Sequence, residues 1–339
     1  MYIRTEGTNT SCMQYGITKR LIGHQNFLEI SRENFDEAKM AHDCLGEALR
    51  LEEKFNIILE NYREFESELL SLCLNFAIFS DRTWSSFQNE IHIVNRRVLN
   101  LLTTSRLYVD QIPHNMNAIY ADKEKMALVQ QKMTQEYDSN LGYRVIEALR
   151  NYAQHRGLPV FQLQYNMPFR PDSSGDQIEY TITPSLCVSS LRKEKGFKRS
   201  VLDELEAIGD LIDLKPLVRQ YMESIGRIHS YVRELLAPGI SKWDSTILKL
   251  QALFWERFGE DTTEDPSSIF SPDNLGLALV ARQDSAAVVE SVYIIEDLIK
   301  RREWLVRKNN TLRRYNSAIV SSESRPGDAL DVQSDKRSK

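Results

Sequence analysis

The chain has 339 residues, which is enough to bury the core of one large domain or of two ordinary domains. Its apolar share of 42% and charged share of 27% are typical of globular proteins, and its net charge of −5 excludes a uniformly basic surface but not a local basic patch. The four cysteines are scattered and form neither a CxxC pair nor a cluster with zinc-ligand spacing. Residues 1–20 lack the apolar run of a signal peptide, and no apolar stretch of about 18 residues could span a membrane. We therefore expect a cytoplasmic protein with no metal or other cofactor.

Two apolar stripes predict a helical hairpin early in the chain. Apolar side chains recur at spacings of three and four residues across 55–79, and again across 84–112. Ser80-Asp81 interrupts the pattern and offers helix caps, while Pro113 predicts the end of the second arm. We expect two long antiparallel helices over these two ranges.

A third long helix and a pair of strands are predicted to follow. The apolar spacing favours one helix over 122–155, and Gly157 and Pro159 are typical of residues just beyond a helix end. Apolar and polar residues then alternate across 160–167 and 177–183, with a turn-rich segment between them. We expect these two segments to pair as an antiparallel hairpin that packs on the helices.

Helical periodicity returns in the second half of the chain. It predicts a short helix from Ser200, a longer one from Asp213 to Pro238-Gly239, another after Ser241 and a long one over 285–315, with a polar loop over 259–273. The expected fold class is mainly α: a long-helix bundle with an antiparallel β-hairpin inserted after the third long helix. The expected regions are a helical part with the hairpin (1–195), a helical C-terminal part packed on it (196–320) and a disordered tail (321–339). The first two regions form either one domain or two.

One short motif carries the functional prediction, because the sequence has no P-loop, no GxGxxG after a strand, no HExxH and no GxSxG. Arg150-Asn151-x-x-x-His155 places three groups of catalytic type at the predicted end of the third helix. An arginine can hold phosphate oxygens with two parallel hydrogen bonds, and a histidine can move a proton near neutral pH. An asparagine can orient either of them. Together these groups suit cleavage of a phosphodiester without a metal.

The segment ALRNYAQHRGLPV, which contains this motif, resembles the HEPN superfamily in its uncharacterised prokaryotic members. The resemblance covers the family arginine (Arg150), the polar residue after it (Asn151) and the family histidine (His155). It implies a helical bundle, a homodimer and an RNA-cleaving site built from the motifs of both protomers, used in toxin–antitoxin systems or antiviral defence. The strand pair after the motif and the helical second half go beyond the minimal family pattern.

The spacing within the motif also bears on the oligomeric state. Asn151 and His155 are four residues apart and share a helix face, whereas Arg150 and His155 are five apart, roughly 140° around an α-helix. One helix therefore presents Arg150 and His155 poorly to a single phosphate. Fraying near Gly157, or a second motif across a two-fold axis, would bring the two groups together, and we expect a homodimer.

Two basic stretches are secondary predictions for RNA contact, because cations meet phosphates and interleaved aromatic side chains can stack on bases. The first stretch contains Arg192, Lys193, Lys195, Lys198 and Arg199, and the second contains Arg301, Arg302, Arg307 and Lys308. The alternative for each is a solvated helix face. The other histidines, including His92 and His229, lack a partner four residues on, so we expect them to be structural or exposed.

Two functions remain open on the sequence. The first is a metal-independent endoribonuclease that cleaves RNA through attack of the ribose 2′-OH at a dimeric Arg/His site, with an antitoxin or other protein as a possible partner. The second is a non-catalytic helical scaffold or sensor that binds a protein or RNA partner. A catalytic site requires Arg150, Asn151 and His155 to be exposed together, whereas a scaffold permits their burial or dispersal.

Overall fold

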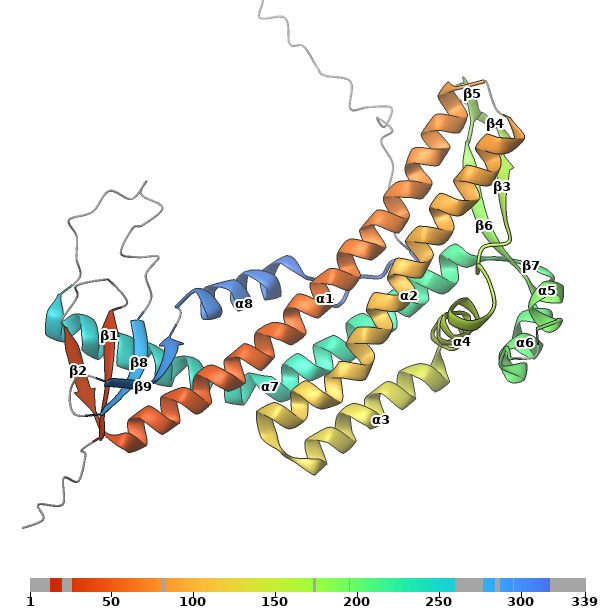
Figure 1. Cartoon of the computed structure of the whole chain (residues 1–339). Helices are drawn as coiled ribbons and strands as arrows, with labels where there is room; N and C mark the ends of the chain where they lie inside the picture. Colours follow the sequence, from red (N-terminus) through yellow and green to blue (C-terminus); the bar gives the residue numbers. More distant parts are fainter. Residues whose placement is uncertain are drawn as a thin grey trace, which may run out of the picture.

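The computed structural model describes residues 13–19, 26–80, 83–172, 175–194, 196–259, 277–283, 287–294 and 296–317, and over these ranges the chain is mainly helical with small antiparallel sheets (Figure 1). The helices are α1 (Arg32–Ile78), α2 (Trp84–Tyr120), α3 (Lys123–Ser139), α4 (Leu141–His155), α5 (Val188–Arg192), α6 (Arg199–Glu206), α7 (Leu214–Phe258) and α8 (Glu296–Lys308). The strands are β1 (Met13–Lys19), β2 (Phe27–Ile30), β3 (Gln162–Asn166), β4 (Phe169–Asp172), β5 (Gly175–Ile178), β6 (Thr181–Cys187), β7 (Leu211–Asp213), β8 (Leu277–Gln283) and β9 (Ala287–Ile294). Among the described residues, no helix has both the length and the apolar character needed to cross a membrane.

Helices α1 and α2 form the predicted long antiparallel pair, and both extend beyond the predicted bounds (Figure 1). The hydroxyl of Ser31 accepts a hydrogen bond from the backbone of Asn34 and begins α1 well before residue 55, and a capping box at Thr83 begins α2. Pro113 was expected to end the second arm, but it lies inside α2. The helix continues because Ile112 and Met116, on either side of the proline, are both buried in the core, and this burial offsets the lost hydrogen bond.

The third predicted helix is two helices, α3 and α4, because the backbone is extended at Asn140. Asp122 caps α3 as the sequence suggests. The break lets α4 turn onto α7: a Cβ on Gly142 would lie 2.5 Å from the carbonyl oxygen of Leu217, and the side chain of Gln220 accepts from the Gly142 amide at 2.6 Å. Only glycine allows this close approach of the two backbones.

The strands after α4 differ in detail from the expected hairpin. The structure pairs β3 with β6 in antiparallel register, with Asn166 opposite Thr181, and β7 extends this sheet on the other side of β6. The second strand therefore begins later than the predicted 177–183. Residues 169–172 and 175–178 instead pair with one another as β4 and β5, at the tip of the α1–α2 pair (Figure 1).

The second half of the chain departs most from prediction. Helix α7 continues through Pro238-Gly239, where a stop was predicted, because Leu236 and Trp243 on either side are both buried. The long helix predicted over 285–315 is wrong: its first part is strand β9, and only α8 is helical. Strand β9 is held by pairing with the buried strand β8. The expected tail beyond 321 and most of the expected loop over 259–273 lie outside the described residues.

A four-stranded sheet, with strand order β2–β1–β8–β9, was not predicted at all. It joins the beginning of the described chain to its later part, with Lys19 opposite Leu277. Helix α1 also packs against α7 and α8, across the expected boundary near residue 195.

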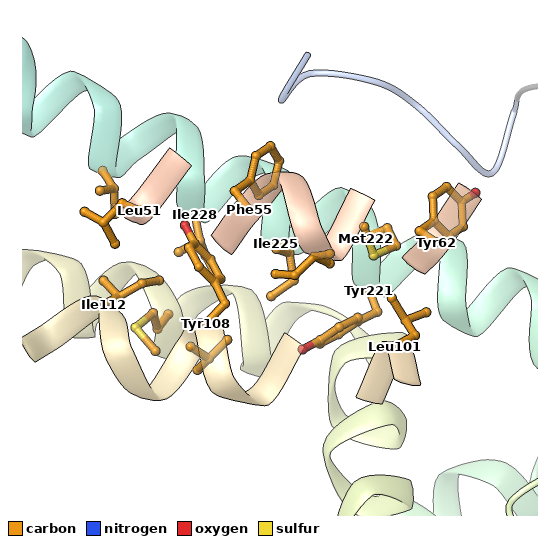
Figure 2. Packing of buried hydrophobic residues seen from close by; sticks show 14 of the residues in the cluster. Leu51, Phe55, Tyr62, Leu101, Tyr108, Ile112, Tyr221, Met222, Ile225 and Ile228 are labelled. Carbon is orange, nitrogen blue, oxygen red and sulfur yellow. The ribbon is translucent and has the colours of Figure 1, made fainter. Parts of the chain in front are cut away.

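The core lies between α1, α2 and α7, where Phe55, Tyr108 and Tyr221 are fully buried (Figure 2). At its centre is a polar cluster. The hydroxyl of Tyr108 donates to Nδ1 of His229 at 2.6 Å, and Nε2–H of His229 donates to Glu52 at 3.2 Å. Arg233 donates twice to Glu52, at 2.6 and 2.8 Å. The ring of His229 also stacks on Phe55 at 4.0 Å, so this histidine is structural, one of the two alternatives that the sequence left open.

Candidate functional site

The candidate site lies at the C-terminal end of α4, which is held by its apolar face. Val145, Ile146 and Leu149 are buried, and α4 packs against α2, α3, α6 and α7. The opposite face carries the motif: Arg150 is half-buried, and Asn151 and His155 are exposed. The helical period thus places all three motif residues on or near the surface while their neighbours anchor the helix.

Two of the three motif residues touch one another. Nη1 of Arg150 donates to Oδ1 of Asn151 at 2.9 Å, which fixes the direction of the guanidinium. The other N–H groups of Arg150 make no hydrogen bond within the described part of the chain, so they can hold phosphate oxygens. The side chain of His155 is exposed and has no hydrogen-bond partner among the described residues.

Helix α4 is continuous through His155, so fraying does not realign the motif. Arg150 and His155 remain about 140° apart around the axis, as in any regular α-helix. A single copy of α4 therefore places the two groups on different sides of its surface.

A buried carboxyl group next to Arg150 was not predicted. Glu147 lies one turn before Arg150 and accepts a hydrogen bond from Arg106 of α2 at 3.1 Å, and Arg106 also pairs with Asp110 at 2.7 Å. Burial raises the pKa of Glu147, and the positive charges of Arg106 and Arg150 only partly oppose this rise. Glu147 and Arg150 are three residues apart in the helix, so their closeness follows from the sequence, but the contribution of Arg106 depends on how α2 packs against α4.

The structure brings the first basic stretch close to the motif. The rings of Tyr152 and Phe197 lie 6.2 Å apart, and Gly196 lies beside the side chain of Arg156. Nζ of Lys198 donates to the hydroxyl of Tyr137 at 2.6 Å and also lies over its ring. The end of α4 and the loop before α6 thus form one surface that carries cations and aromatic rings.

The cations of this stretch are not equally available. Arg192 is held by ion pairs with Asp203 and Glu206 of α6. Lys193 and Arg199 are exposed, and Lys195 lies outside the described residues.

The second basic stretch lies on α8, which packs against α1 rather than near α4 (Figure 1). Arg302 is only 7% exposed and pairs with Asp244 at 2.6 Å, so it belongs to the packing of α8 on α7 rather than to an exposed basic face. The other three predicted cations are exposed but face carboxylates: Arg301 pairs with Glu53, Arg307 with Glu303 and Lys308 with Glu60.

The residues that the structure describes contain no group of three or more histidine, cysteine or acidic side chains arranged to hold a metal ion. No protein-family model, curated protein or solved structure matches the chain.

Proposed function

We propose that this protein is a metal-independent endoribonuclease that cleaves RNA at Arg150 and His155. The observation that carries the proposal is the position of the motif at one helix end, where Asn151 and His155 are exposed, Arg150 is half-buried, and Asn151 orients the guanidinium of Arg150 at 2.9 Å. The resemblance of this segment to the HEPN superfamily adds support.

The chemistry follows from the groups present. RNA carries its own nucleophile, the ribose 2′-OH, which DNA lacks. His155 takes the proton from this hydroxyl or gives one to the departing 5′ oxygen. Arg150 stabilises the negative charge that builds on the phosphate during attack. The products are a 2′,3′-cyclic phosphate and a free 5′ hydroxyl.

We propose further that the active site forms between two copies of the chain. Arg150 and His155 lie on different sides of one α4, so a two-fold axis beside this helix end would place Arg150 of one protomer near His155 of its partner. The exposed cations beside this helix end, such as Lys193 and Arg199, would then guide RNA into the shared site.

Cleavage of mixed RNA in EDTA by the purified full-length chain tests the chemistry. His155→Ala is expected to lower the rate by about 10²–10⁴-fold. Arg150→Ala should be comparably slow, and Arg150→Lys should restore little because the planar fork is lost. Gln154→Ala is the matched control, since Gln154 is exposed in the same helical turn but has no proposed role. Cleavage that needs a divalent metal, or that survives His155→Ala, would refute this mechanism.

A mixing experiment tests the shared site. Arg150→Ala and His155→Ala protomers are each expected to be inactive alone. When they exchange subunits, half of the dimers are mixed and each of these has one intact site, so about a quarter of the normal activity should return. A strictly monomeric protein in light scattering at micromolar concentration would contradict the dimer.

A surface outside the α4 site favours a second function, that of a scaffold which binds a partner protein. The tip of the α1–α2 pair exposes Leu74, Ile78, Phe79 and Trp84, whose exposed fractions are 60, 60, 61 and 77%. Several large apolar side chains exposed near one another in the chain are a feature of interaction sites. If the chain cleaves no RNA, but Trp84→Ser releases a partner that co-purifies from the native source, the scaffold function replaces the nuclease.

A further inference from the structure

A pocket of about 540 Å³ lies away from the α4 site, between α1, α7 and the segment that follows α8. Figure 2 shows Tyr62 of α1 beside this segment, which is drawn in blue. The segment is firmly placed. The carbonyl oxygen of Thr311 comes so close to Gly226 of α7 that no side chain could fit there, and Arg233 donates to the backbone oxygen of Asn309 at 3.2 Å. This pocket has the size of a site for a small molecule.

The pocket has an excess of positive charge in a chain whose net charge is −5. Its two carboxylates are already satisfied. Arg219 donates twice to Glu66 at 2.8 Å, and Glu60 accepts from Lys308 at 2.7 Å and from Arg63 at 2.8 Å. Three cations, Arg219, Lys308 and Arg63, are therefore paired with two carboxylates.

The groups in the pocket that lack a partner include two donors. Arg313 lines the pocket and makes no hydrogen bond or ion pair with any described residue. Asn309 also lines it, is 3% exposed, and has a buried Nδ2 without a hydrogen-bond partner. Because Nδ2 of Asn309 is itself buried, Arg313 is the unpaired donor that a ligand in the pocket can reach. With a fourth cation against two paired carboxylates, the pocket favours a dianion.

One side of the pocket is apolar. The rings of Tyr62 and Tyr315 meet edge to face at 4.8 Å, and Leu59 and Leu70 line the wall beside them. Leu70 is 51% exposed, so this wall offers apolar surface that a ligand could cover. A bare anion such as inorganic phosphate would leave the apolar wall unused.

We infer that this pocket binds a small phosphomonoester that carries a planar or apolar body, the chemistry of a mononucleotide. The phosphate meets Arg313 and the neighbouring cations, while the body lies against the two tyrosines. The inference does not depend on the nuclease proposal, because the pocket shares no residue with the α4 site.

Isothermal titration calorimetry of the full chain tests the inference, with AMP and phenyl phosphate as probes and with adenosine and inorganic phosphate as partial ligands. We expect AMP or phenyl phosphate to saturate one site per chain, and each partial ligand to bind at least about tenfold more weakly. Arg313→Gln should weaken binding at least about tenfold. Arg314→Gln is the matched control, because Arg314 is the next residue and is also exposed but does not line this pocket.

A further variant separates this site from the α4 site. His155→Ala is expected to keep full AMP binding, whatever it does to RNA cleavage. The inference is overturned if neither probe saturates at millimolar concentration, if Arg313→Gln and Arg314→Gln weaken binding equally, or if His155→Ala abolishes it.

Discussion

Replacement of Glu52 by alanine is expected to lower the free energy of unfolding by roughly 3–5 kcal/mol, because it leaves Arg233 without its counter-charge and the buried His229 without its acceptor. Glu52 is 5% exposed and accepts two hydrogen bonds from Arg233 and one from His229. Burial by itself would raise the pKa of Glu52, but the hydrogen bonds from Arg233 and His229 outweigh it and lower the pKa from 4.5 to about 2. This shift corresponds to roughly 3 kcal/mol, which agrees with the cost expected on removal.

Urea unfolding at pH 7, followed by far-ultraviolet circular dichroism, measures this loss from the shift in midpoint at constant slope. Glu64→Ala is the matched control on the same helix. Glu64 is 42% exposed and pairs with Arg97 at 2.6 Å, so its removal should cost no more than about 1 kcal/mol. If Glu52→Ala does not fold, Glu52→Gln keeps the shape, removes the charge and should show a smaller loss. An effect of Glu52→Ala no larger than that of Glu64→Ala would refute the reasoning.

The remaining predictions concern pH and two glycines. Burial lowers the pKa of His229 below 6.5, so the unfolded chain binds a proton before the folded chain does, and stability should fall as the pH drops below about 6.5. Glu52 adds a further loss as the pH falls from 4.5 towards 2. His229→Gln should reduce the change in the urea midpoint between pH 7 and pH 5. If the midpoint of the variant changes with pH as much as that of the parent, His229 is not the group responsible. Gly46→Ala, in α1 with nothing within 4 Å of the added Cβ, should raise stability by about 1 kcal/mol; a loss would contradict the open space described there. Gly226→Ala should instead lower the free energy of unfolding by about 1–3 kcal/mol, because the new Cβ forces the segment at Thr311 away. An unchanged melting temperature would contradict this prediction.

The sequence predicted those helix faces and helix starts that depend on residues close together in the chain. The apolar seam is buried as a helix face of α1 from Phe55 to Leu72, whereas Phe79 at its predicted end lies beyond the helix and is 61% exposed. Asp122 and Asp213, which were expected at helix starts, cap α3 and α7 with their side chains. Predictions failed where distant packing outweighed a local signal. Both Pro113 and Pro238 lie inside helices because buried neighbours hold the helix together across them.

The prediction of a long helix over 285–315 failed for a different reason. Val288, Val292, Ile295 and Ile299 follow a helical spacing, but Val288 and Val292 lie in β9, where partners in β8 decide the structure. Strand β8 is close to β9 in the chain, but on its other side it pairs with β1, which lies far away in the sequence. The local pattern of residues 285–315 carries no signal of that distant pairing.

For the candidate site, the residues were predicted but their surroundings were not. The polar edge of an amphipathic helix follows from spacing alone, so the exposure of Asn151 and His155 could be expected. The contact of Arg106 with Glu147, and the closeness of Phe197 to Tyr152, arise from the packing of α2 and of the loop before α6 on α4. Whether the motif cleaves RNA stays a prediction for the assays above.

The pairing of β1 with β8 has a consequence for how the chain reaches its fold. Strand β1 leaves the ribosome early and can pair at once with β2, but its other neighbour in the sheet, β8, is made only after α7 is complete. The ion pair of Lys39 likewise cannot form until Glu290, 251 residues later, has been made. Until then the hydrogen-bonding edge of β1 is open to other chains. Pairing between such distant segments is slow, so this end of the protein should form last. Premature termination within the segment after α7 would leave that edge permanently uncovered and make the fragment prone to aggregate.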